Sequence, residues 1–468
     1  MNARVYISAA HKSSGKTMLA IGLTGALRAR GRTVQTFKKG PDFIDPMWLA
    51  TASGRACWNL DFNTQPVAEI EALYAQRAAD ADITLIEGNK GLHDGVALDG
   101  RDSNAAMARL LDCPVLLVVD TTGMTRGIAP IVRGIAEFDP AVRVAGVILN
   151  RVGGPRHEGK LRAALETYTD LPVVGALARQ SALAVDERHL GLIPSNESAI
   201  AREQIERLIA AVTDGVDLDA IEQLADAAPR RSWPVQPALP AQPVADVRIG
   251  IARGAAFGFY YPDDLEAFAQ AGAELVPFDP ETEAEIPACD ALFIGGGFPE
   301  MRMDALERNA EMRAAIRAFC DAGRPVYAEC GGLMYLGRSI AWNDQRHAMV
   351  GALPLDTTMH RRPQGRGYVV LEETPEFPWP DLQSGAAHEP VRAHEFHHSS
   401  AAVDSTDGLH FGFTVLRGHG VDGRRDGVVY NRIFATYAHQ RAVGGRDWPR
   451  RFVAYIRDLR TRQGSPDA

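Results

Sequence analysis

Along the first half of the chain, short apolar runs rich in β-branched residues alternate with longer segments of helical spacing. Such apolar runs, separated by helices, are typical of parallel strands that are covered on both faces. The helical segments include Thr17–Ala29 and Asp102–Leu111. The pattern therefore predicts an α/β domain over residues 1–225. Its predicted strands are Arg4–Ala9, Val34–Lys38, Ile83–Glu87, Pro114–Asp120, Val144–Asn150 and Pro172–Leu177.

The pattern changes over residues 226–246, where prolines interrupt an alanine-rich, polar stretch. Proline lacks the backbone N–H donor and has a fixed φ, so this stretch suits neither a regular helix nor a regular strand. We interpret it as an interdomain linker. The prolines are Pro229, Pro234, Pro237, Pro240 and Pro243.

After the linker the alternation resumes and predicts a second α/β domain over residues 247–445. Its predicted helices are Pro262–Ala271 and Met303–Ala322. A further helix, Asp447–Arg460, is expected within a C-terminal helix and tail over residues 446–468. The predicted parallel strands are Val247–Ala252, Glu274–Phe278, Ala291–Gly295 and Pro325–Glu329.

Composition agrees with a soluble protein of two or three domains. The chain has 468 residues, of which 46% are hydrophobic and 23% are charged. No apolar run approaches the roughly 18 residues that a membrane span needs, and the N-terminal residues show no signal-peptide pattern. The five cysteines are scattered and lack metal-ligand spacing. We therefore expect neither disulfides nor a zinc site, and a cytoplasmic location.

The net charge of −9 argues against nucleic acid as the main partner, because no basic face is available to neutralise phosphates.

Residues 10–17 form a candidate phosphate-binding loop between the first predicted strand and the first predicted helix. In such a loop, backbone N–H groups and the helix N-terminus face the anion, Lys16 contacts the terminal phosphates, and the Thr17 hydroxyl binds Mg²⁺. Gly-Lys-Thr alone also occurs at ordinary helix starts, but its place after the first strand favours ATP binding. The usual first glycine is replaced by Ala10. The predicted nucleotide-binding residues are His11, Lys12, Ser13, Ser14, Gly15, Lys16 and Thr17.

Carboxylates follow two further predicted strands. Asp42 and Asp45 come after the second strand, and Glu87 and Asp94 lie at or beyond the end of the third. The carboxyl ends of parallel strands share one edge of the sheet, which is the usual ligand crevice. Each carboxylate alone would be read as a helix cap or a solvated turn, but together they predict an Mg²⁺-ATP and catalytic site. The expected metal ligands are Thr17, Asp45 and Glu87.

Cys330 follows a predicted strand and precedes two glycines. A cysteine at a sharp strand-to-helix turn is expected to be exposed, with its thiolate stabilised by the helix N-terminus. The backbone N–H of Gly331 and the loop containing Gly296 and Gly297 would form the oxyanion hole. His439 is the candidate base. A lone cysteine is more often a small buried hydrophobe, but these neighbours favour a nucleophile.

Three histidines, His394, His397 and His398, lie close together in the chain. Their spacing could suit a metal, but no further residue completes a site. Substrate contact or a structural role is the favoured reading.

The two sites together predict one reaction. A carboxylate acylates poorly until its oxygen becomes a leaving group, and phosphoryl transfer from ATP would supply an acyl phosphate. Ammonia released from glutamine at Cys330 would then displace phosphate and leave an amide.

Ordered segments along nearly the whole chain resemble the cobyrinate a,c-diamide synthase family. The resemblance implies an N-terminal domain similar to dethiobiotin synthetase and a class I glutaminase domain. It further implies Asp42, Asp45, Glu87 and Asp94 as Mg²⁺-ATP and substrate residues, a Cys–His pair without a third carboxylate, a tetrapyrrole carboxylate as acceptor, and a homodimer. The matching segments are residues 14–17, 37–46, 59–61, 87–88, 91–95, 146–152, 187–192, 295–300, 330–336 and 394–397.

Several departures from the family pattern lie near the expected acceptor site, among them Lys39, Trp48 and the pair Asn89-Lys90. These features resemble a sister branch that amidates sirohaem for dissimilatory sulfite reductase. A corrin precursor is the favoured acceptor and sirohaem the alternative. A partition-type ATPase switch is disfavoured because His11 replaces its signature lysine, and a binding module with a dead glutaminase is disfavoured because both Cys330 and His439 are present.

Overall fold

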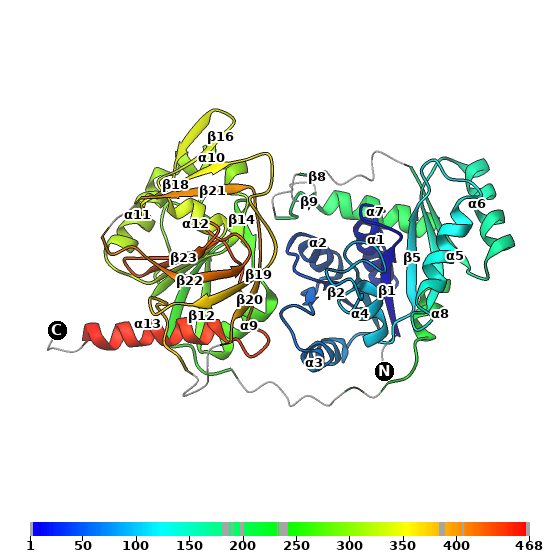
Figure 1. The fold of residues 1–468 in the computed structure, drawn as a ribbon, viewed down its shortest axis with the longest axis horizontal. Helices are drawn as coiled ribbons and strands as arrows, with labels where there is room; N and C mark the ends of the chain where they lie inside the picture. Colours follow the sequence, from blue (N-terminus) through cyan, green and yellow to red (C-terminus); the bar gives the residue numbers. More distant parts are fainter. Residues whose placement is uncertain are drawn as a thin grey trace. The chain divides into compact units, whose positions relative to one another are not determined.

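The computed structural model describes residues 3–179, 187–188, 191–196, 201–231, 233, 242–382, 389–404 and 407–464. The chain forms two compact units, Met1–Pro237 and Ala238–Ala468 (Figure 1). The division between them falls inside the proline-rich stretch predicted as a linker.

The first unit is built on a seven-stranded sheet with the order β3-β2-β4-β1-β5-β6-β7. All of its strand pairs are parallel. Six strands agree with the predicted ones to within two residues, and the short β3 had not been predicted. The strands are β1 (Ala3–Ala9), β2 (Val34–Lys39), β3 (Trp58–Leu60), β4 (Ile83–Glu87), β5 (Val115–Asp120), β6 (Val144–Val152) and β7 (Val173–Ala178).

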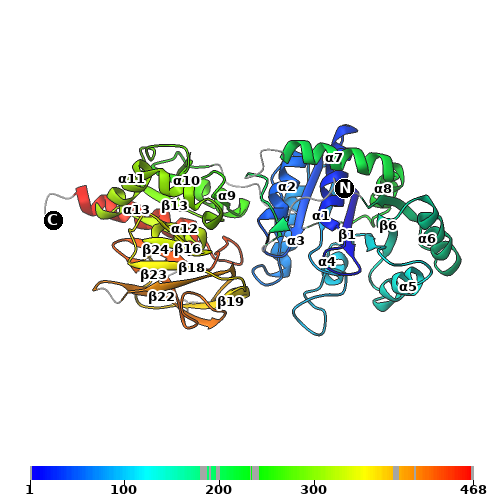
Figure 2. The ribbon, with the colours of Figure 1, turned by 90° about the horizontal axis from the view of Figure 1, so that it is seen from above.

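Helices cover both faces of this sheet (Figure 2). On one face, Tyr6, Phe37 and Ile86 pack with residues of four helices in a single buried cluster. These helices are α3 (Val67–Ala78), α4 (Asn104–Leu110), α5 (Ile128–Phe138) and α6 (Pro155–Tyr168). The other face carries α1 (Lys16–Ala29), α2 (Ile44–Ser53), α7 (Ala201–Gly215) and α8 (Leu218–Asp226). A short hairpin, β8 (Glu187–Arg188) with β9 (Gly191–Leu192), completes the described elements.

Part of the predicted linker is packed against the first unit. The carbonyl of Pro229 accepts a 2.6 Å hydrogen bond from Arg4, and Arg231 donates to the carbonyl of Leu110. The Trp233 ring lies 4.9 Å from that of Tyr74. The segment up to residue 233 is therefore held by tertiary contacts, whereas residues 232 and 234–241 lie outside the described residues.

The second unit contains a nine-stranded sheet with the order β12-β10-β13-β15-β24-β23-β22-β19-β20. Its first five strands are parallel and its last four continue in antiparallel pairing. Only four of the parallel strands had been predicted. The parallel strands are β12 (Ala273–Phe278), β10 (Val247–Ala252), β13 (Ala291–Ile294), β15 (Val326–Glu329) and β24 (Ile433–Thr436). The antiparallel strands are β23 (Arg425–Tyr430), β22 (His410–Arg417), β19 (Gly365–Glu373) and β20 (Val391–His397).

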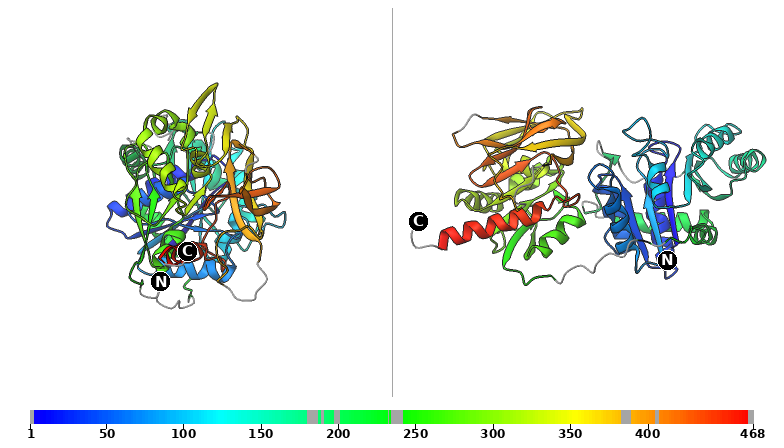
Figure 3. Two further views of the ribbon diagram at one scale, coloured as in Figure 1. Left: turned by 90° about the vertical axis from the view of Figure 1, so that its left-hand side faces the viewer. Right: turned by 60° about the horizontal axis from the view of Figure 1, so that its bottom comes forward.

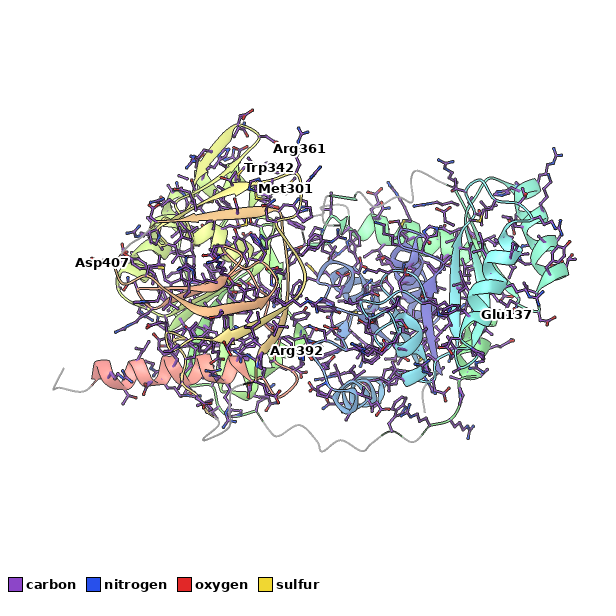
Figure 4. All side chains as sticks on the ribbon, in the orientation of Figure 1. Glu137, Met301, Trp342, Arg361, Arg392 and Asp407 are labelled. Atoms are coloured by element: carbon purple, nitrogen blue, oxygen red, sulfur yellow. The ribbon has the colours of Figure 1, made fainter. Side chains whose placement is uncertain are left out.

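Two buried clusters hold the second unit together, one on each face of the large sheet. The helices of this unit can be followed in Figure 3. On one face lie α9 (Pro262–Gln270) and α13 (Trp448–Gly464). On the other lie α10 (Met303–Arg308), α11 (Ala310–Asp321) and α12 (Gly331–Leu336). Figure 4 draws the side chains on the ribbon. A four-stranded sheet contributes residues to the buried cluster that contains α10, α11 and α12. Its strands, in spatial order, are β17 (Gln345–Ala348), β16 (Ser339–Trp342), β18 (Leu355–Met359) and β21 (Ser399–Val403). A separate two-stranded antiparallel sheet is formed by β11 (Phe257–Phe259) and β14 (Gly296–Gly297).

One helix prediction needs correction, and the predicted C-terminal helix is present as α13. The predicted helix Met303–Ala322 is broken at Asn309, whose side chain accepts from the backbone N–H of Met312 and donates to the carbonyl of Pro280. An asparagine that makes such local bonds favours a new helix start over a continuous helix. The C-terminal helix is an integral part of the second unit, since Trp448 and Phe452 lie in its core.

Among the described residues, no helix combines the length and the apolarity that crossing a membrane requires.

Candidate functional site

The candidate phosphate loop joins β1 to α1, and its backbone is held by Asn150 at the end of β6. Asn150 Nδ2 donates a 2.8 Å hydrogen bond to the carbonyl of Ser14. Gly15 has φ +91°, and a Cβ built there would lie 2.1 Å from the same Nδ2 atom. A side chain at position 15 would therefore be both strained and in collision. Helix α1 has no side-chain cap at its N-terminus, which suits a bound anion.

Lys16 begins this helix and is buried. Burial, together with the charge of Lys38, lowers the pKa of Lys16 to about 8, against the opposing effect of Glu87 and Asp45. His11, Lys12 and Ser13 are exposed around the loop. Positive side chains, backbone N–H groups and a helix N-terminus thus lie together, as phosphate binding requires.

The structure brings Thr17, Asp45 and Glu87 together. The Thr17 hydroxyl donates to Glu87 Oε1 at 2.6 Å and to Asp45 Oδ2 at 3.1 Å. Lys38, which the sequence had not singled out, contacts the carboxylates of both. Lys38 lies directly opposite Glu87 in the parallel pairing of β2 and β4. The common edge of the sheet therefore positions this cluster.

These oxygens suit Mg²⁺, which prefers hard ligands and few protein carboxylates. Glu87 Oε2 is buried without a hydrogen-bond partner in the described part of the chain, so this carboxylate oxygen is available to bind a cation. Burial raises the pKa of Glu87, and the charge of Lys38 opposes that rise. No group of three or more His, Cys, Asp or Glu side chains among the described residues could hold a metal ion. Mg²⁺ would therefore depend on phosphate oxygens and water as well as on Thr17, Asp45 and Glu87.

Asp42 and Asp94 make the local contacts expected of capping residues. Asp42 Oδ1 accepts from the backbone N–H groups of Ile44 and Asp45, at the start of α2. Asp94 is exposed, and its Oδ2 accepts from the N–H of Gly91 at 3.0 Å. Roles of Asp42 and Asp94 toward nucleotide or acceptor remain predictions.

In the second unit, Cys330 and His439 follow neighbouring parallel strands. Glu329 at the end of β15 lies opposite Thr436 at the end of β24, and the Cys330 N–H donates to the Thr436 carbonyl at 2.7 Å. Cys330 has φ 47° and ψ −100°, which is a strained conformation for a residue with a side chain. The chain turns here from strand to helix, as at the nucleophile of other acyl-transfer enzymes.

The glycine-rich loop lies against this turn. A Cβ built on Gly331 would lie 3.1 Å from the backbone N of Gly297, and one built on Gly296 would lie 2.5 Å from His439 Cε1. Such distances leave room for hydrogen only. The three predicted oxyanion residues, Gly296, Gly297 and Gly331, thus lie together with Cys330, the candidate nucleophile, and His439, the candidate base.

The predicted exposure of Cys330 and stabilisation of its thiolate need correction. Cys330 is only 7% exposed, and burial, with the charge of Glu300 next in effect, raises the pKa of its thiol. Helix α12, which follows Cys330, has six residues. Burial therefore favours the thiol over the thiolate at Cys330.

His439 is held on both sides. Its Nδ1 lies 3.1 Å from Glu329 Oε2, and its ring stacks on that of His394 with centroids 4.9 Å apart. The backbone N–H of His439 donates to the His394 carbonyl at 2.8 Å. Burial, then His439, lowers the pKa of His394 well below its ordinary value, so His394 is a neutral neighbour. Contrary to the implied Cys–His pair, a carboxylate does contact His439, and β15 supplies it.

The remaining histidines of the cluster make structural contacts. The His397 ring stacks on Tyr437 with centroids 3.8 Å apart, and its Nδ1 lies 2.8 Å from the Ser399 carbonyl. His398 Nδ1 lies 3.1 Å from the His360 carbonyl.

Sequence reasoning missed four residues that shape the two centres. They are Lys38, Glu329, Asp426 and Asn150. Of these, only Glu329 carries a signal in the sequence, as a carboxylate at the end of the predicted apolar strand before Cys330, where a buried charge needs a partner. Asp426 accepts from the Thr436 hydroxyl and from the N–H groups of Tyr437 and Ala438, so it supports the segment that leads to His439. Asn150 carried no comparable signal, because its role depends on a contact between distant segments.

Two family models match the two units. Residues 7–193 match the CobQ/CobB/MinD/ParA nucleotide binding domain, and residues 248–445 match the CobB/CobQ-like glutamine amidotransferase domain. The fold and both centres therefore define a nucleotide-binding protein with a glutamine amidotransferase domain. This confirms the predicted α/β fold class with a phosphate-loop domain followed by a glutaminase domain.

Curated relatives narrow the class. Cobyrinate a,c-diamide synthase of Magnetococcus marinus is 44% identical over 450 residues, which cover 95% of each chain. Those of Syntrophotalea carbinolica and Archaeoglobus fulgidus are 41% and 38% identical, over 97% and 96% of this chain and 98% and 96% of theirs. The chain belongs to the cobyrinate a,c-diamide synthase family, as its motifs had indicated, and it is a glutamine-dependent amidoligase.

Proposed function

We propose that this enzyme uses ATP and glutamine to convert peripheral carboxylates of cobyrinate, or of its metal-free form, to carboxamides. The observation that carries the proposal is that this chain contains two centres. One is the cluster of carboxylates beside the phosphate loop, and the other is formed by Cys330, His439 and the glycines around them. Neither centre alone would account for both nucleotide and glutamine.

In the second unit, the thiol proton of Cys330 passes to His439, and the sulfur attacks the amide carbon of glutamine. The N–H groups of Gly297 and Gly331 receive the developing oxyanion. His439 then gives the proton to departing ammonia, and water releases glutamate from the thioester. The strained backbone of Cys330 directs its sulfur toward this reaction.

In the first unit, the loop 10–17 and Lys16 hold the ATP phosphates. Thr17, Asp45 and Glu87 would hold Mg²⁺, which neutralises phosphate charge when bound. An acceptor carboxylate held beside the γ-phosphoryl group attacks its phosphorus, ADP leaves, and an acyl phosphate forms; ammonia then attacks the acyl carbon and phosphate leaves. This chemistry needs positioning and positive charge more than a covalent protein intermediate.

The test is mass spectrometry of candidate acceptors incubated with the protein, Mg²⁺-ATP and glutamine. Cobyrinate, hydrogenobyrinate and sirohaem are compared. The proposal predicts that OH is replaced by NH₂ at two carboxylates of a corrin precursor. Amidation of sirohaem alone would replace the proposed acceptor by the alternative, and amidation of none would contradict a tetrapyrrole acceptor. Light scattering of the same preparation tests the predicted homodimer.

A further inference from the structure

Glu329 is a carboxylate in the middle of an apolar core, directly before the nucleophile. It is 3% exposed and ends the buried strand β15. Tyr327, two residues earlier, points to the same face of the sheet, and its hydroxyl donates to Glu329 Oε1 at 2.6 Å. A charge at such a place is costly unless each oxygen is bonded.

Both oxygens of Glu329 have separate partners. Oε1 also accepts from the backbone N–H of Gln440 at 3.1 Å, and Oε2 lies 3.1 Å from His439 Nδ1. The side chain of Gln440 closes the arrangement by donating to the Tyr327 hydroxyl at 2.8 Å. One carboxylate oxygen thus accepts hydrogen bonds from the Gln440 backbone and the Tyr327 hydroxyl. The other oxygen contacts the His439 imidazole.

This arrangement fixes the tautomer of His439. A carboxylate only accepts hydrogen bonds, so Nδ1 must carry a proton, and Nε2 is left as the basic nitrogen. Because Glu329 and Thr436 are in register on adjacent strands, the base and its partner are held by the sheet itself.

We propose that Glu329 is the positioning residue of the glutaminase centre: it holds His439 in the tautomer whose Nε2 accepts the Cys330 proton, and it stabilises the imidazolium that results. This inference rests on the proposed role of Cys330 and His439. The proton moves from sulfur to Nε2 and later to the departing ammonia, and no proton is transferred to Glu329. The third member of the centre, after Cys330 and His439, is therefore a carboxylate. It is supplied by the residue before the nucleophile and not by residues after the base.

Glu329→Gln tests the proposal sharply because glutamine has the same shape but only one acceptor oxygen. The Gln440 N–H and the Tyr327 hydroxyl are donors that claim that oxygen. The amide NH₂ would then face His439 Nδ1, so that Nδ1 loses its proton and Nε2 carries it. In that tautomer Nε2 cannot accept the thiol proton, and a tautomer error of this kind in a Ser–His–Asp triad costs on the order of 10⁴-fold in kcat.

The experiment compares Glu329→Gln and Glu329→Asp in the full chain. We expect glutamine-driven kcat to fall at least about 10²-fold in the Gln variant, by the triad logic above, while KM for glutamine and ammonia-driven amidation are retained. Aspartate keeps the acceptor-only charge, so we expect it to retain more activity than glutamine does. A packing role predicts the opposite order, since glutamine is isosteric and aspartate leaves a gap.

Three controls complete the design. Glu281→Gln makes the same change at a carboxylate of the second unit whose side chain is 4% exposed and which binds Arg302, and it should leave the glutaminase rate unchanged. Added to His439→Ala, Glu329→Gln should cause no further loss, because Glu329 acts through His439. Equal or higher activity of the Gln variant relative to Asp, or an additive loss in the double variant, would overturn the inference. Full glutaminase activity of Cys330→Ala would instead overturn the proposed function on which it rests.

Discussion

Lys38 and Glu87 lie opposite each other on adjacent parallel strands, with Nζ 2.9 Å from Oε1. Although burial lowers it, the pKa of Lys38 is raised overall by Asp45 and Glu87, so the ammonium remains charged among carboxylates. We expect Lys38→Met to lower the free energy of unfolding by about 3 kcal/mol, as removal of one partner from a buried ion pair does. Urea unfolding of the variant measures this.

Mg²⁺-ATP should reduce the loss in Lys38→Met, because the bound cation would replace the missing charge between Asp45 and Glu87. Arg133→Ala is the control, since its ion pair with Glu137 is exposed and worth less than about 1 kcal/mol. A loss that Mg²⁺-ATP leaves unchanged would count against Mg²⁺ at these oxygens.

Gly15→Ala should abolish ATP binding. The new Cβ would collide with Asn150 Nδ2, and the alanine backbone would have to adopt φ +91°. Gly31→Ala has a similar φ of +83° but nothing within 4 Å, so it should cost only the roughly 1–2 kcal/mol of left-handed strain. Calorimetric titration with Mg²⁺-ATP separates the two. Unimpaired binding by Gly15→Ala would mean that this loop does not receive the phosphates.

Glu373→Gln should lower stability in a pH-dependent way. Despite burial, Arg451 and Arg446 hold the pKa of Glu373 below its ordinary value. Between the lowered folded-state pKa and the ordinary one, the native state binds fewer protons than the unfolded state, so the contribution is complete at neutral pH and fades as pH falls through that window. We expect a loss of roughly 3 kcal/mol at pH 7, shrinking below about pH 4.5. Denaturant unfolding at pH 7 and at pH 4 measures both values, and equal losses would contradict the assignment.

The sequence predicted the parallel strands of both sheets except β3 and β24, because buried strands such as β5 read as continuous apolar runs. It also brought Thr17, Asp45 and Glu87 to one edge, since strand order and chain direction decide which ends meet. The antiparallel half of the second sheet was missed. Strands such as β22, in which only Gly412 and Phe413 are buried, lack that signal and are paired through contacts distant in sequence.

At the cysteine centre, local spacing marked Cys330 and the glycines as candidates, and their roles remain predictions. The sequence did not predict that Cys330 is only 7% exposed, because burial depends on contacts between segments distant in the chain. The partnership of Glu329 with His439 joins residues that are 110 positions apart. Only the register of β15 with β24 reveals it.

The most direct test of the account compares Cys330→Ala with the unchanged protein for amidation of cobyrinate, using glutamine in one reaction and ammonium in the other. Cys320→Ala, a buried cysteine on α11, is the matched control and should behave as the unchanged protein with either donor. We predict that Cys330→Ala forms no amide from glutamine and forms it normally from ammonium. Amide formation from glutamine at the unchanged rate would contradict the assignment of Cys330, and failure with ammonium would contradict the separation of the reaction into two centres.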